Sequence, residues 1–520
     1  MEPVLINGEW RPSDPVSSFQ AMNPNVGAPN DEIFPVSSRA DTDAALTAGV
    51  AAAHQLRKMP RQVIAEFLNA YADAIDDDMR RIVDTAHRET GLPTSPRLEA
   101  ELPRTTDQLR QAARAVVEGS WVTATIDTAS NIRSMYAPLD KPVVVFGPNN
   151  FPMAFNGVAG GDFAAAIAAG NPVIAKANPG HPHTTQLLAE AALKAIQETA
   201  MPDAMVQLIY RVRGEDGLVF VSDDRVGAVG FTGSKNGGLR LKAAADAAGV
   251  PIYLELGSVN PIFLLEGALE ERGEEIAQEF YASCTLGAGQ YCTNPGFVVV
   301  PTSEAGDRFV KTAGELFGQA DGGTLLGEPD HLGEGVGTLK NHGAEVLVGG
   351  QIVDSPRFAF ENTLLTVTAT EFLDEAEGLQ TEVFGPVSLL VRADTPEEMA
   401  GLAQVMEGNL TGGIYSETSD AAAYETVEAA LRPRVGRLLN DKMPTGVAVV
   451  PSMNHGGPYP ATGHPGFTAV GIPASIHRFA ALYSYDNVAE HRLPEPLRNA
   501  NPTGEMMRLV DGSWTTEDVV

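Results

Sequence analysis

Val143-Val144-Val145-Phe146 runs directly into Gly147-Pro148-Asn149-Asn150-Phe151-Pro152, and this stretch decides the fold. A continuous apolar run of strand length that ends in a turn is typical of a strand buried on both faces. A helix of small residues is expected next, from 156 to about 169, and a second buried strand at Pro172–Lys176. The alternation continues through three further runs, Val206–Tyr210, Val226–Phe231 and Ile252–Leu256. Buried strands that alternate with helices predict a largely parallel, doubly wound α/β sheet, which binds ligands at the carboxyl ends of its strands.

The sequence on either side of this region predicts more α/β structure. Residues 1 to about 40 form an N-terminal arm of short strands, and the helical region that follows, 41–118, carries one apolar stripe, made of Ile64, Phe67, Leu68, Tyr71 and Ile75. A second α/β region begins near residue 265 and runs to about 455, with Phe297–Val300 as a strand. A final strand is expected over 480–485. The chain is long enough for two packed domains.

The composition is that of an ordinary globular protein and excludes several classes of function. The 520 residues are 43% hydrophobic and 20% charged, with a net charge of -31. So acidic a chain is a poor partner for a phosphate backbone, and we expect no nucleic acid binding. Two cysteines do not make a disulfide framework, and the sequence shows neither a signal peptide nor an apolar run of about 18 residues. We therefore expect a soluble cytoplasmic protein without a membrane partner.

One of the two cysteines, Cys292, lies in the glycine-rich stretch Thr285-Leu286-Gly287-Ala288-Gly289-Gln290-Tyr291-Cys292-Thr293-Asn294-Pro295-Gly296. Glycines on both sides let a ligand approach the main chain closely. A thiol in such a turn can be partly exposed and its thiolate stabilised by backbone N–H groups, which favours a nucleophile. The alternative is a buried structural cysteine, which is the commoner fate of a lone Cys.

Several polar residues stand at predicted strand ends. Lys176 and Glu255 are charged residues in apolar strands, where burial would raise the pKa of Glu255 toward the range of a general base. Phe231-Thr232-Gly233-Ser234 precedes a helix whose first N–H groups could bind a pyrophosphate. Each also has a simpler interpretation: a surface residue or ion pair for Lys176 and Glu255, a turn residue for Asn150, and a cap or loop charge for Glu382.

Taken together, the order of these segments resembles that of the aldehyde dehydrogenase superfamily over nearly the whole chain: Asn150, Lys176, Phe231–Ser234, Glu255–Gly257, Gly289–Cys292 and Glu382–Pro386. Glu255 and Cys292 are 37 positions apart. A closer resemblance is to the NADP-using branch that includes 2,5-dioxovalerate (α-ketoglutaric semialdehyde) dehydrogenases. It rests on Asn150–Phe155, Ala159–Asp162, Gly289–Gly296, Pro444–Val447 and His455–Thr462.

The resemblance implies an aldehyde dehydrogenase-like α/β fold with two doubly wound, Rossmann-like domains and a small oligomerisation element. Residues 1–120 and 142–258 would form the coenzyme-binding domain, and residues 259–455 the catalytic domain that carries Cys292. Residues 121–141 and 478–500 would form the oligomerisation element, and residues 501–520 a C-terminal tail. The family pairs its subunits through such an element, so a homodimer or homotetramer is expected.

The resemblance also implies catalytic roles. Cys292 would attack the aldehyde carbon to give a thiohemiacetal, whose oxyanion the Asn150 amide and the Cys292 N–H would stabilise. Loss of hydride would leave a thioester, and Glu255 would activate the water that hydrolyses it to the carboxylate. Cys284 matches no catalytic position and is expected to be structural, and no metal is expected.

The implied coenzyme is NADP, or else NAD. Lys176 would bind the adenosine ribose, Ser234 with Gly233 the pyrophosphate, and Glu382 the nicotinamide ribose, with Phe384 and Gly257 in the same cofactor-binding segments. Many members carry a ribose-binding Glu where this chain has Pro179, and its absence leaves room for a 2′-phosphate. Arg211 and Arg213 are candidates to bind that phosphate.

For the substrate, the branch points to a short aldehyde with a carboxylate, 2,5-dioxovalerate being the best single choice. Arg104 or Arg110 could clamp the carboxylate, unless both are solvated or paired with Glu101 and Asp107. In that case a tunnel flanked by three aromatic residues, Phe155, Phe163 and Tyr291, would suit medium- or long-chain fatty aldehydes. A CoA-acylating dehydrogenase, a catalytically silent homologue and a thiol hydrolase with a His brought in from elsewhere in the chain remain as alternatives.

Overall fold

The computed structural model describes residues 1–519, and its first domain is built on a seven-stranded sheet. In spatial order its strands are β14 (Ile252–Leu256), β13 (Ala228–Gly233), β9 (Val143–Phe146), β10 (Val173–Lys176), β11 (Val206–Ile209), β1 (Val4–Ile6) and β2 (Glu9–Arg11). The first five run parallel, and the N-terminal β1 and β2 add an antiparallel edge. The expected buried strands are therefore confirmed.

The helices of this domain are α1 (Arg39–Leu56), α2 (Arg61–Asp77), α3 (Met79–Thr90), α4 (Glu99–Glu118), α5 (Gly161–Ala168), α6 (Pro182–Thr199), α7 (Gly214–Val221) and α8 (Lys235–Ala248). The apolar stripe predicted in the 41–118 region lies on α2 and is buried throughout. Helix α5 begins five residues later than expected, because turns occupy 156–160. Two small sheets flank the domain, one of β12 (Arg211–Val212), β6 (Phe34–Ser37) and β3 (Pro15–Phe19), the other of β4 (Met22–Asn23) and β5 (Ala28–Pro29).

The order of the strands places the ligand site. From β9 the chain moves outward to β10 and β11, then returns past β9 to β13 and β14. Because parallel crossovers are right-handed, the connections before and after this reversal lie on opposite faces of the sheet. The loops that follow β9 and β13 therefore part at the carboxyl edge and leave a crevice there. These loops contain Asn150 and Gly233–Ser234.

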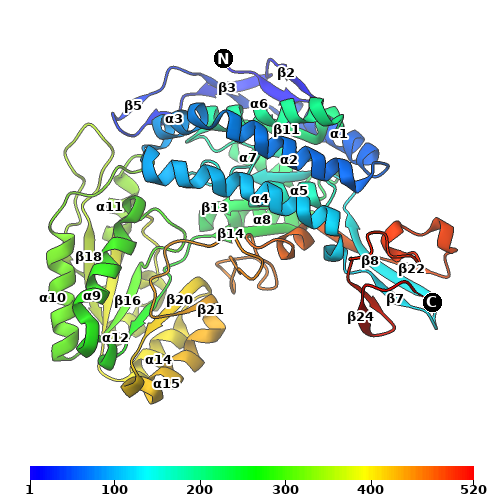
Figure 1. Ribbon diagram of the computed structural model, residues 1–520. Helices are drawn as coiled ribbons and strands as arrows, with labels where there is room; N and C mark the ends of the chain where they lie inside the picture. The colour runs from blue at the N-terminus through cyan, green and yellow to red at the C-terminus, as the bar shows by residue number, and fades with distance from the viewer. Residues whose placement is uncertain (520) are drawn as a thin grey trace.

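The second domain has a seven-stranded sheet of its own. In spatial order its strands are β17 (Glu345–Val348), β18 (Thr363–Thr368), β19 (Val387–Ala393), β16 (Phe297–Pro301), β15 (Ile262–Leu264), β20 (Asn409–Tyr415) and β21 (Val435–Asn440). All its pairs are parallel except that of β17. Its helices are α9 (Glu266–Thr285), α10 (Glu304–Phe317), α11 (Asp330–Asn341), α12 (Ala369–Asp374), α13 (Ala376–Leu379), α14 (Pro396–Val405) and α15 (Ala421–Leu431). The green-to-orange ribbon of this domain lies below and to one side of the first in Figure 1.

A third sheet projects from the first domain (Figure 1). It consists of β22 (Ala480–Asp486), β8 (Ile132–Pro138), β7 (Thr125–Asp127), β23 (Arg508–Val510) and β24 (Ser513–Thr515). The described part of the expected C-terminal tail, residues 501–519, is therefore not separate from this sheet, because β23 pairs with β7 and β24 with β23; residue 520 lies outside the described residues. Within residues 1–519, no helix combines the length and apolar character that a membrane crossing requires.

Candidate functional site

Cys292 lies in the loop between α9 and β16, and the main chain of this loop is held in place from two sides. Gly289 has a φ of 71°, and a Cβ there would lie 2.1 Å from the Gly385 carbonyl oxygen, so only glycine fits. The buried Asn260 donates its side-chain amide to the carbonyls of Cys292 and Asn294, both at 2.9 Å. The cysteine is thus presented by a loop with little freedom to move.

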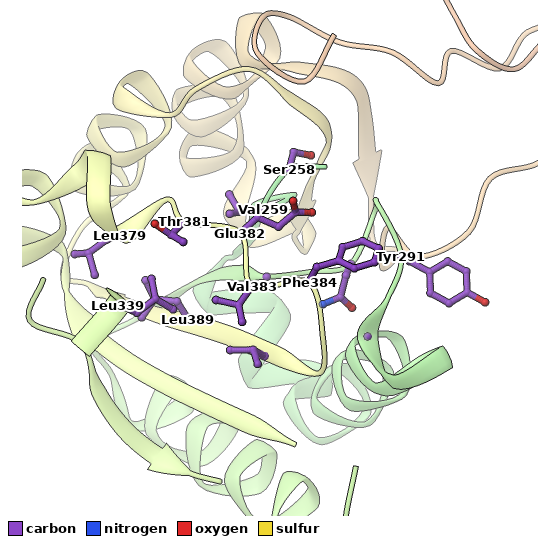
Figure 2. A pocket seen from close by; sticks show the side chains of 14 residues that line it. Ser258, Val259, Tyr291, Leu339, Leu379, Thr381, Glu382, Val383, Phe384 and Leu389 are labelled. Carbon is purple, nitrogen blue, oxygen red and sulfur yellow. The ribbon is translucent and has the colours of Figure 1, made fainter. Parts of the chain in front are cut away.

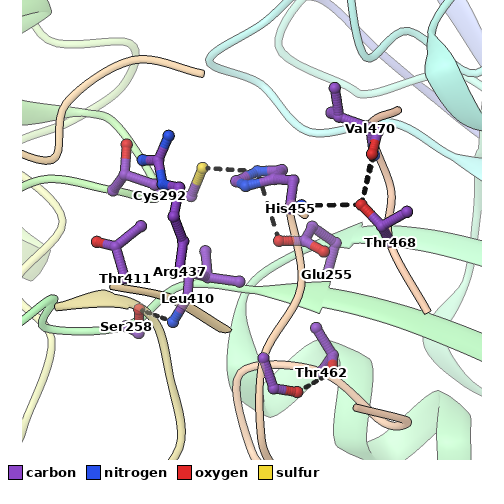
Figure 3. A network of polar contacts seen from close by, with 12 residues as sticks. Glu255, Ser258, Cys292, Leu410, Thr411, Arg437, His455, Thr462, Thr468 and Val470 are labelled. Carbon is purple, nitrogen blue, oxygen red and sulfur yellow. Dashed lines mark hydrogen bonds and ion pairs between the residues drawn. The ribbon is translucent and has the colours of Figure 1, made fainter. Parts of the chain in front are cut away.

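His455 links Cys292 to Glu255, which comes from a different part of the chain (Figure 3). The Nε2 atom of His455 lies 3.4 Å from the Cys292 sulfur and 3.4 Å from a carboxylate oxygen of Glu255. Both His455 and Glu255 are buried. Glu255 was a candidate from the sequence, whereas His455 was not, although its segment was part of the resemblance.

The chain brings His455 to this position by returning to the first sheet after the second domain. An isolated antiparallel bridge joins Glu255 to Thr462, and the Leu256 N–H donates to the Ala461 carbonyl at 2.9 Å. The His455 N–H in turn donates to the Thr468 hydroxyl at 2.8 Å. Pairings across some 200 positions leave no local pattern, which is why sequence reasoning missed this histidine.

Burial controls the protonation of all three groups. Burial, followed by repulsion from Glu255 and Glu382, raises the pKa of Cys292 to about 12. Burial and the charge of Asp162 raise the pKa of Glu255 well above its ordinary value. Burial and nearby arginines lower the pKa of His455 to about 3, so it is neutral. The expectation of a stabilised thiolate is therefore corrected: the thiol at rest is neutral and needs a base, because burial outweighs the backbone N–H group.

The Asn150 side chain faces the cysteine loop. Its amide donates to the Gln290 carbonyl at 3.0 Å, which fixes the side chain and leaves a second N–H available. Asn150, Glu255 and Cys292 all line one cavity of about 350 Å³. This arrangement can hold a donor, an acid or base and a nucleophile around one reacting atom.

An aromatic wall adjoins the site: the Phe155 ring lies 5.8 Å from the His455 ring, and Tyr291 directly precedes Cys292 in the chain. The rings of Phe151 and Phe155 are 5.2 Å apart, and those of Phe151 and Tyr291 5.5 Å. The expected Phe155 and Tyr291 thus lie in one cluster, whereas Phe163 packs against Tyr71 in the core of the first domain and does not border the site.

Arg104 lies against this wall, with its guanidinium 5.4 Å from the Phe151 ring and 5.6 Å from the Phe155 ring. Its Nε and Nη2 atoms are buried and have no hydrogen-bond partner among residues 1–519. The charges of Arg104 and Cys292 are close enough to affect each other's pKa. The ion pair considered between Arg104 and Glu101 does not form, because the Glu101 oxygens bind Arg97 and two backbone N–H groups.

Arg110, the other candidate for a substrate carboxylate, is placed elsewhere. Its guanidinium binds Asp73 at 2.6 Å and Asp76 at 2.8 Å on the neighbouring helix α2. The sequence interpretation of Arg110 as a substrate residue is therefore corrected. On a helix, residues six apart point to different sides, and only Arg104 faces the cysteine.

The cavity beside Cys292 continues toward the N-terminus of α8. Its lining includes Thr232, Gly233, Ser234, Gly257, Glu382 and Phe384, all at strand or loop ends. Ser234 caps α8 by accepting a hydrogen bond from the Gly237 N–H and itself lines the cavity, so the N-terminus of α8 lies beside the cavity. A Cβ at Gly257 would lie 2.1 Å from the Glu382 carboxylate oxygens, so the Glu382 carboxylate packs directly against the Gly257 backbone and no side chain fits at this position.

Glu382 also borders a narrower pocket behind Phe384 (Figure 2). Figure 2 shows Glu382 beside Ser258, while Tyr291 points away from the leucines 339, 379 and 389. Burial raises the pKa of Glu382 to about 8, although the Ser258 N–H opposes the shift. Near neutral pH this carboxyl can act as a donor or as an acceptor toward a hydroxyl group.

Lys176 ends β10 and extends over the ring of Phe146, at 5.6 Å from its centre. Burial and the charge of Arg211 lower the pKa of Lys176 to about 8, so these two cations lie near each other. Arg213 instead binds Asp216 at 2.8 Å. Of the two arginines considered for a phosphate, the geometry therefore favours Arg211.

Comparisons with known proteins agree with this geometry. A sequence profile described as "Aldehyde dehydrogenase family" matches residues 10–458. "Alpha-ketoglutaric semialdehyde dehydrogenase 2" of Azospirillum brasilense is 38% identical, covering 95% of this chain and 96% of its own. "Alpha-ketoglutaric semialdehyde dehydrogenase" of Acinetobacter baylyi is 34% identical over 98% of both chains. A solved structure of 3,6-anhydro-L-galactose dehydrogenase in complex with NAP superimposes with a TM-score of 0.80, at 21% identity over 93% of this chain and 99% of that one.

Proposed function

The chain belongs to the aldehyde dehydrogenase family, and from that premise we propose that it oxidises 2,5-dioxovalerate, an α-ketoglutaric semialdehyde, to 2-oxoglutarate. It is an oxidoreductase that acts on aldehydes with NAD(P). The observation that carries the substrate is the Arg104 guanidinium beside the cysteine, whose buried Nε and Nη2 atoms have no hydrogen-bond partner within residues 1–519. In a chain of net charge -31, a cation with free donors at this place suits an anionic substrate.

Catalysis begins with the neutral thiol. The partly exposed Cys292 thiol loses its proton to solvent as the sulfur attacks the aldehyde carbon, which leaves the Glu255 carboxylate free to act as the base of the second half-reaction. The free N–H of Asn150 and the Cys292 N–H stabilise the oxyanion of the thiohemiacetal. His455 stays neutral and contacts both the sulfur and the carboxylate through one nitrogen, which fixes their separation.

The second half of the reaction is hydrolysis. Glu255 abstracts a proton from water as the water oxygen attacks the thioester carbon, and the C–S bond then breaks to release the carboxylate product and the Cys292 thiolate. The thiolate takes up the proton held by Glu255, which restores both the thiol and the Glu255 carboxylate. A buried base beside Cys292 is what hydrolysis needs and what transfer to CoA does not. Cys292 itself is present, so a catalytically silent homologue is not favoured either.

The residues of the long cavity fit NAD(P), which when bound supplies the hydride acceptor. The N-terminus of α8 with Gly233 and Ser234 would hold the pyrophosphate, and Lys176 the adenosine ribose. Glu382 would hold the nicotinamide ribose, with Gly257 and Phe384 bordering it. The lack of a Glu at Pro179 and the proximity of Arg211 to Lys176 support NADP over NAD.

Residues 1–120 and 142–258 would form the coenzyme-binding domain, and residues 259–455 the catalytic domain. The third sheet would form the oligomer contact, because β22 is its edge strand and exposes Leu482 and Tyr483. A homodimer, or a tetramer made of two such dimers, would cover this edge. A free catalytic thiol suits a reducing cytoplasmic compartment.

The experiment is a panel of aldehydes with both coenzymes and without CoA, followed by NAD(P)H absorbance. We expect kcat/KM to be highest for 2,5-dioxovalerate with NADP. Higher values for hexanal and decanal would overturn the substrate, and a clear preference for NAD would overturn the coenzyme.

A further inference from the structure

We propose that Arg97 and Glu101 are positioning residues that hold the Asn150 side chain where it stabilises the oxyanion. The inference rests on the role proposed for Asn150 and concerns two residues that touch neither substrate nor coenzyme in the reaction described above. Arg97 lies in the π-helical turn Thr94–Leu98, directly before α4, and Glu101 lies in the first turn of α4.

Glu101 binds the loop that follows Asn150. Its side chain is completely buried, and one carboxylate oxygen accepts hydrogen bonds from the N–H groups of Met153 at 2.9 Å and Ala154 at 2.8 Å. The other oxygen binds Arg97 Nη1 at 2.5 Å. Residues 148–155 belong to no helix or strand, so the N–H groups of Met153 and Ala154 lack the partners that a helix or sheet would provide, and Glu101 accepts from both of them.

Arg97 binds the same loop at Asn150 itself, whereas Glu101 binds it three and four residues further on. Its Nη2 atom donates to the Asn150 carbonyl at 2.9 Å. Its guanidinium also stacks 4.5 Å from the Phe151 ring and 5.5 Å from the ring of Tyr291, the residue before Cys292. Arg97 therefore joins the loop that carries the oxyanion donor to the loop that carries the nucleophile.

These contacts connect the Asn150 loop to the Cys292 loop in two ways. The Asn150 side chain reaches the cysteine loop through Gln290, and the Asn150 main chain reaches it through Arg97 and Tyr291. An oxyanion donor works only when it is held within a fraction of an ångström of its position. Without the pair, the Asn150 carbonyl loses its partner and the N–H groups of Met153 and Ala154 lose theirs, so the amide is held only by its hydrogen bond to the Gln290 carbonyl.

The test is a double-mutant cycle on the burst of NAD(P)H, measured by rapid mixing of the whole enzyme with substrate and coenzyme. Loss of one oxyanion donor costs about 10²–10³-fold, so Asn150→Ala should slow the burst by this factor. Arg97→Met and Glu101→Gln should each slow it by about 10–100-fold, since the donor is displaced but present. Combined with Asn150→Ala, neither should slow it further, because the donor through which they act is gone.

Other outcomes overturn the proposal in distinguishable ways. If the effects of Arg97→Met and Asn150→Ala multiply, Arg97 does not act through Asn150. If Asn150→Ala keeps the wild-type burst, the proposed role of Asn150 itself fails. Arg97→Lys is the variant to use if Arg97→Met does not fold, because lysine keeps the positive charge opposite Glu101 but cannot also reach the Asn150 carbonyl. Its burst should be slow with coenzyme affinity unchanged, and a wild-type burst would contradict the proposal. Arg110→Met, on the outer side of α4, is the matched control.

Discussion

Replacing Arg104 by Met should have opposite effects on activity and on stability. In the free enzyme the guanidinium is a buried cation whose Nε and Nη2 lack partners, and burial lowers its pKa. Such a charge costs free energy of folding that a Met of similar length does not. We therefore expect Arg104→Met to have a higher Tm than the wild type in the absence of substrate.

The expected loss of activity can be estimated from the two free donors of Arg104, Nε and Nη2. A hydrogen bond to a charged group contributes about 1.5–3 kcal/mol, so two of them to a substrate carboxylate contribute about 3–6 kcal/mol. At about 1.4 kcal/mol per factor of ten, kcat/KM for 2,5-dioxovalerate should fall by about 10²–10⁴-fold. Pentanal has the same chain length without the carboxylate and should lose only a few-fold, since Met still covers the aromatic wall.

The assay is kcat/KM for both aldehydes in wild type, Arg104→Met and Arg110→Met, together with a thermal melt of each. Arg110 binds Asp73 and Asp76 at the surface, where ion pairs contribute about 0–1 kcal/mol, so its variant should keep both activities. An equal loss for both aldehydes in Arg104→Met, or no loss, would refute the carboxylate assignment. So would a large drop in Tm, because it would mean that the arginine is structural.

Three further expectations follow from the same geometry. Cys292→Ala should abolish dehydrogenase turnover while coenzyme binding by fluorescence titration persists, and substantial residual turnover would exclude the nucleophile. Because burial raises the pKa of Cys292 to about 12, its thiol is protonated near neutrality, and the raised pKa of Glu255 acts in the same direction, so kcat/KM should rise steadily between about pH 6 and 9; a flat or falling profile would contradict these shifts. Light scattering at micromolar concentration should give a dimer or tetramer that Tyr483→Asp on β22 weakens, and a wild-type monomer would oppose the proposed contact.

The fold was predictable because its signals are local. Each buried parallel strand is a short apolar run with a turn at its end, as in Val143–Phe146 and Phe297–Pro301, and both appear in the structure where the sequence placed them. The start of α5 was missed because alanine-rich sequence looks helical even where Gly160 and Asn156 make turns. The strands β23 and β24 were missed because each has only three residues, which is too short for a periodic pattern to show.

A site residue could be predicted from the sequence only where its side chain is energetically unfavourable in the local segment, as a charged residue is inside an apolar strand. Glu255 inside an apolar strand is such a residue. In the structure, His455 contacts both Glu255 and Cys292 and so connects the two. His455 shows no such signal, since its role depends on a long-range bridge between Glu255 and Thr462. The different positions of Arg104 and Arg110 depend on which side of α4 faces the cysteine, and Glu101 could be assigned to Arg97 only once the loop after Asn150 was placed.

The most direct test of the central claim is the mass of the Glu255→Gln enzyme after it is mixed with 2,5-dioxovalerate and NADP. With the hydrolytic base removed, oxidation can proceed while deacylation stalls, so a burst of NADPH should precede a very slow steady state. We expect intact-protein and peptide mass spectrometry to find Cys292 heavier by the mass of the aldehyde less two hydrogens. An unmodified Cys292 peptide, or steady turnover equal to the wild type, would contradict the account.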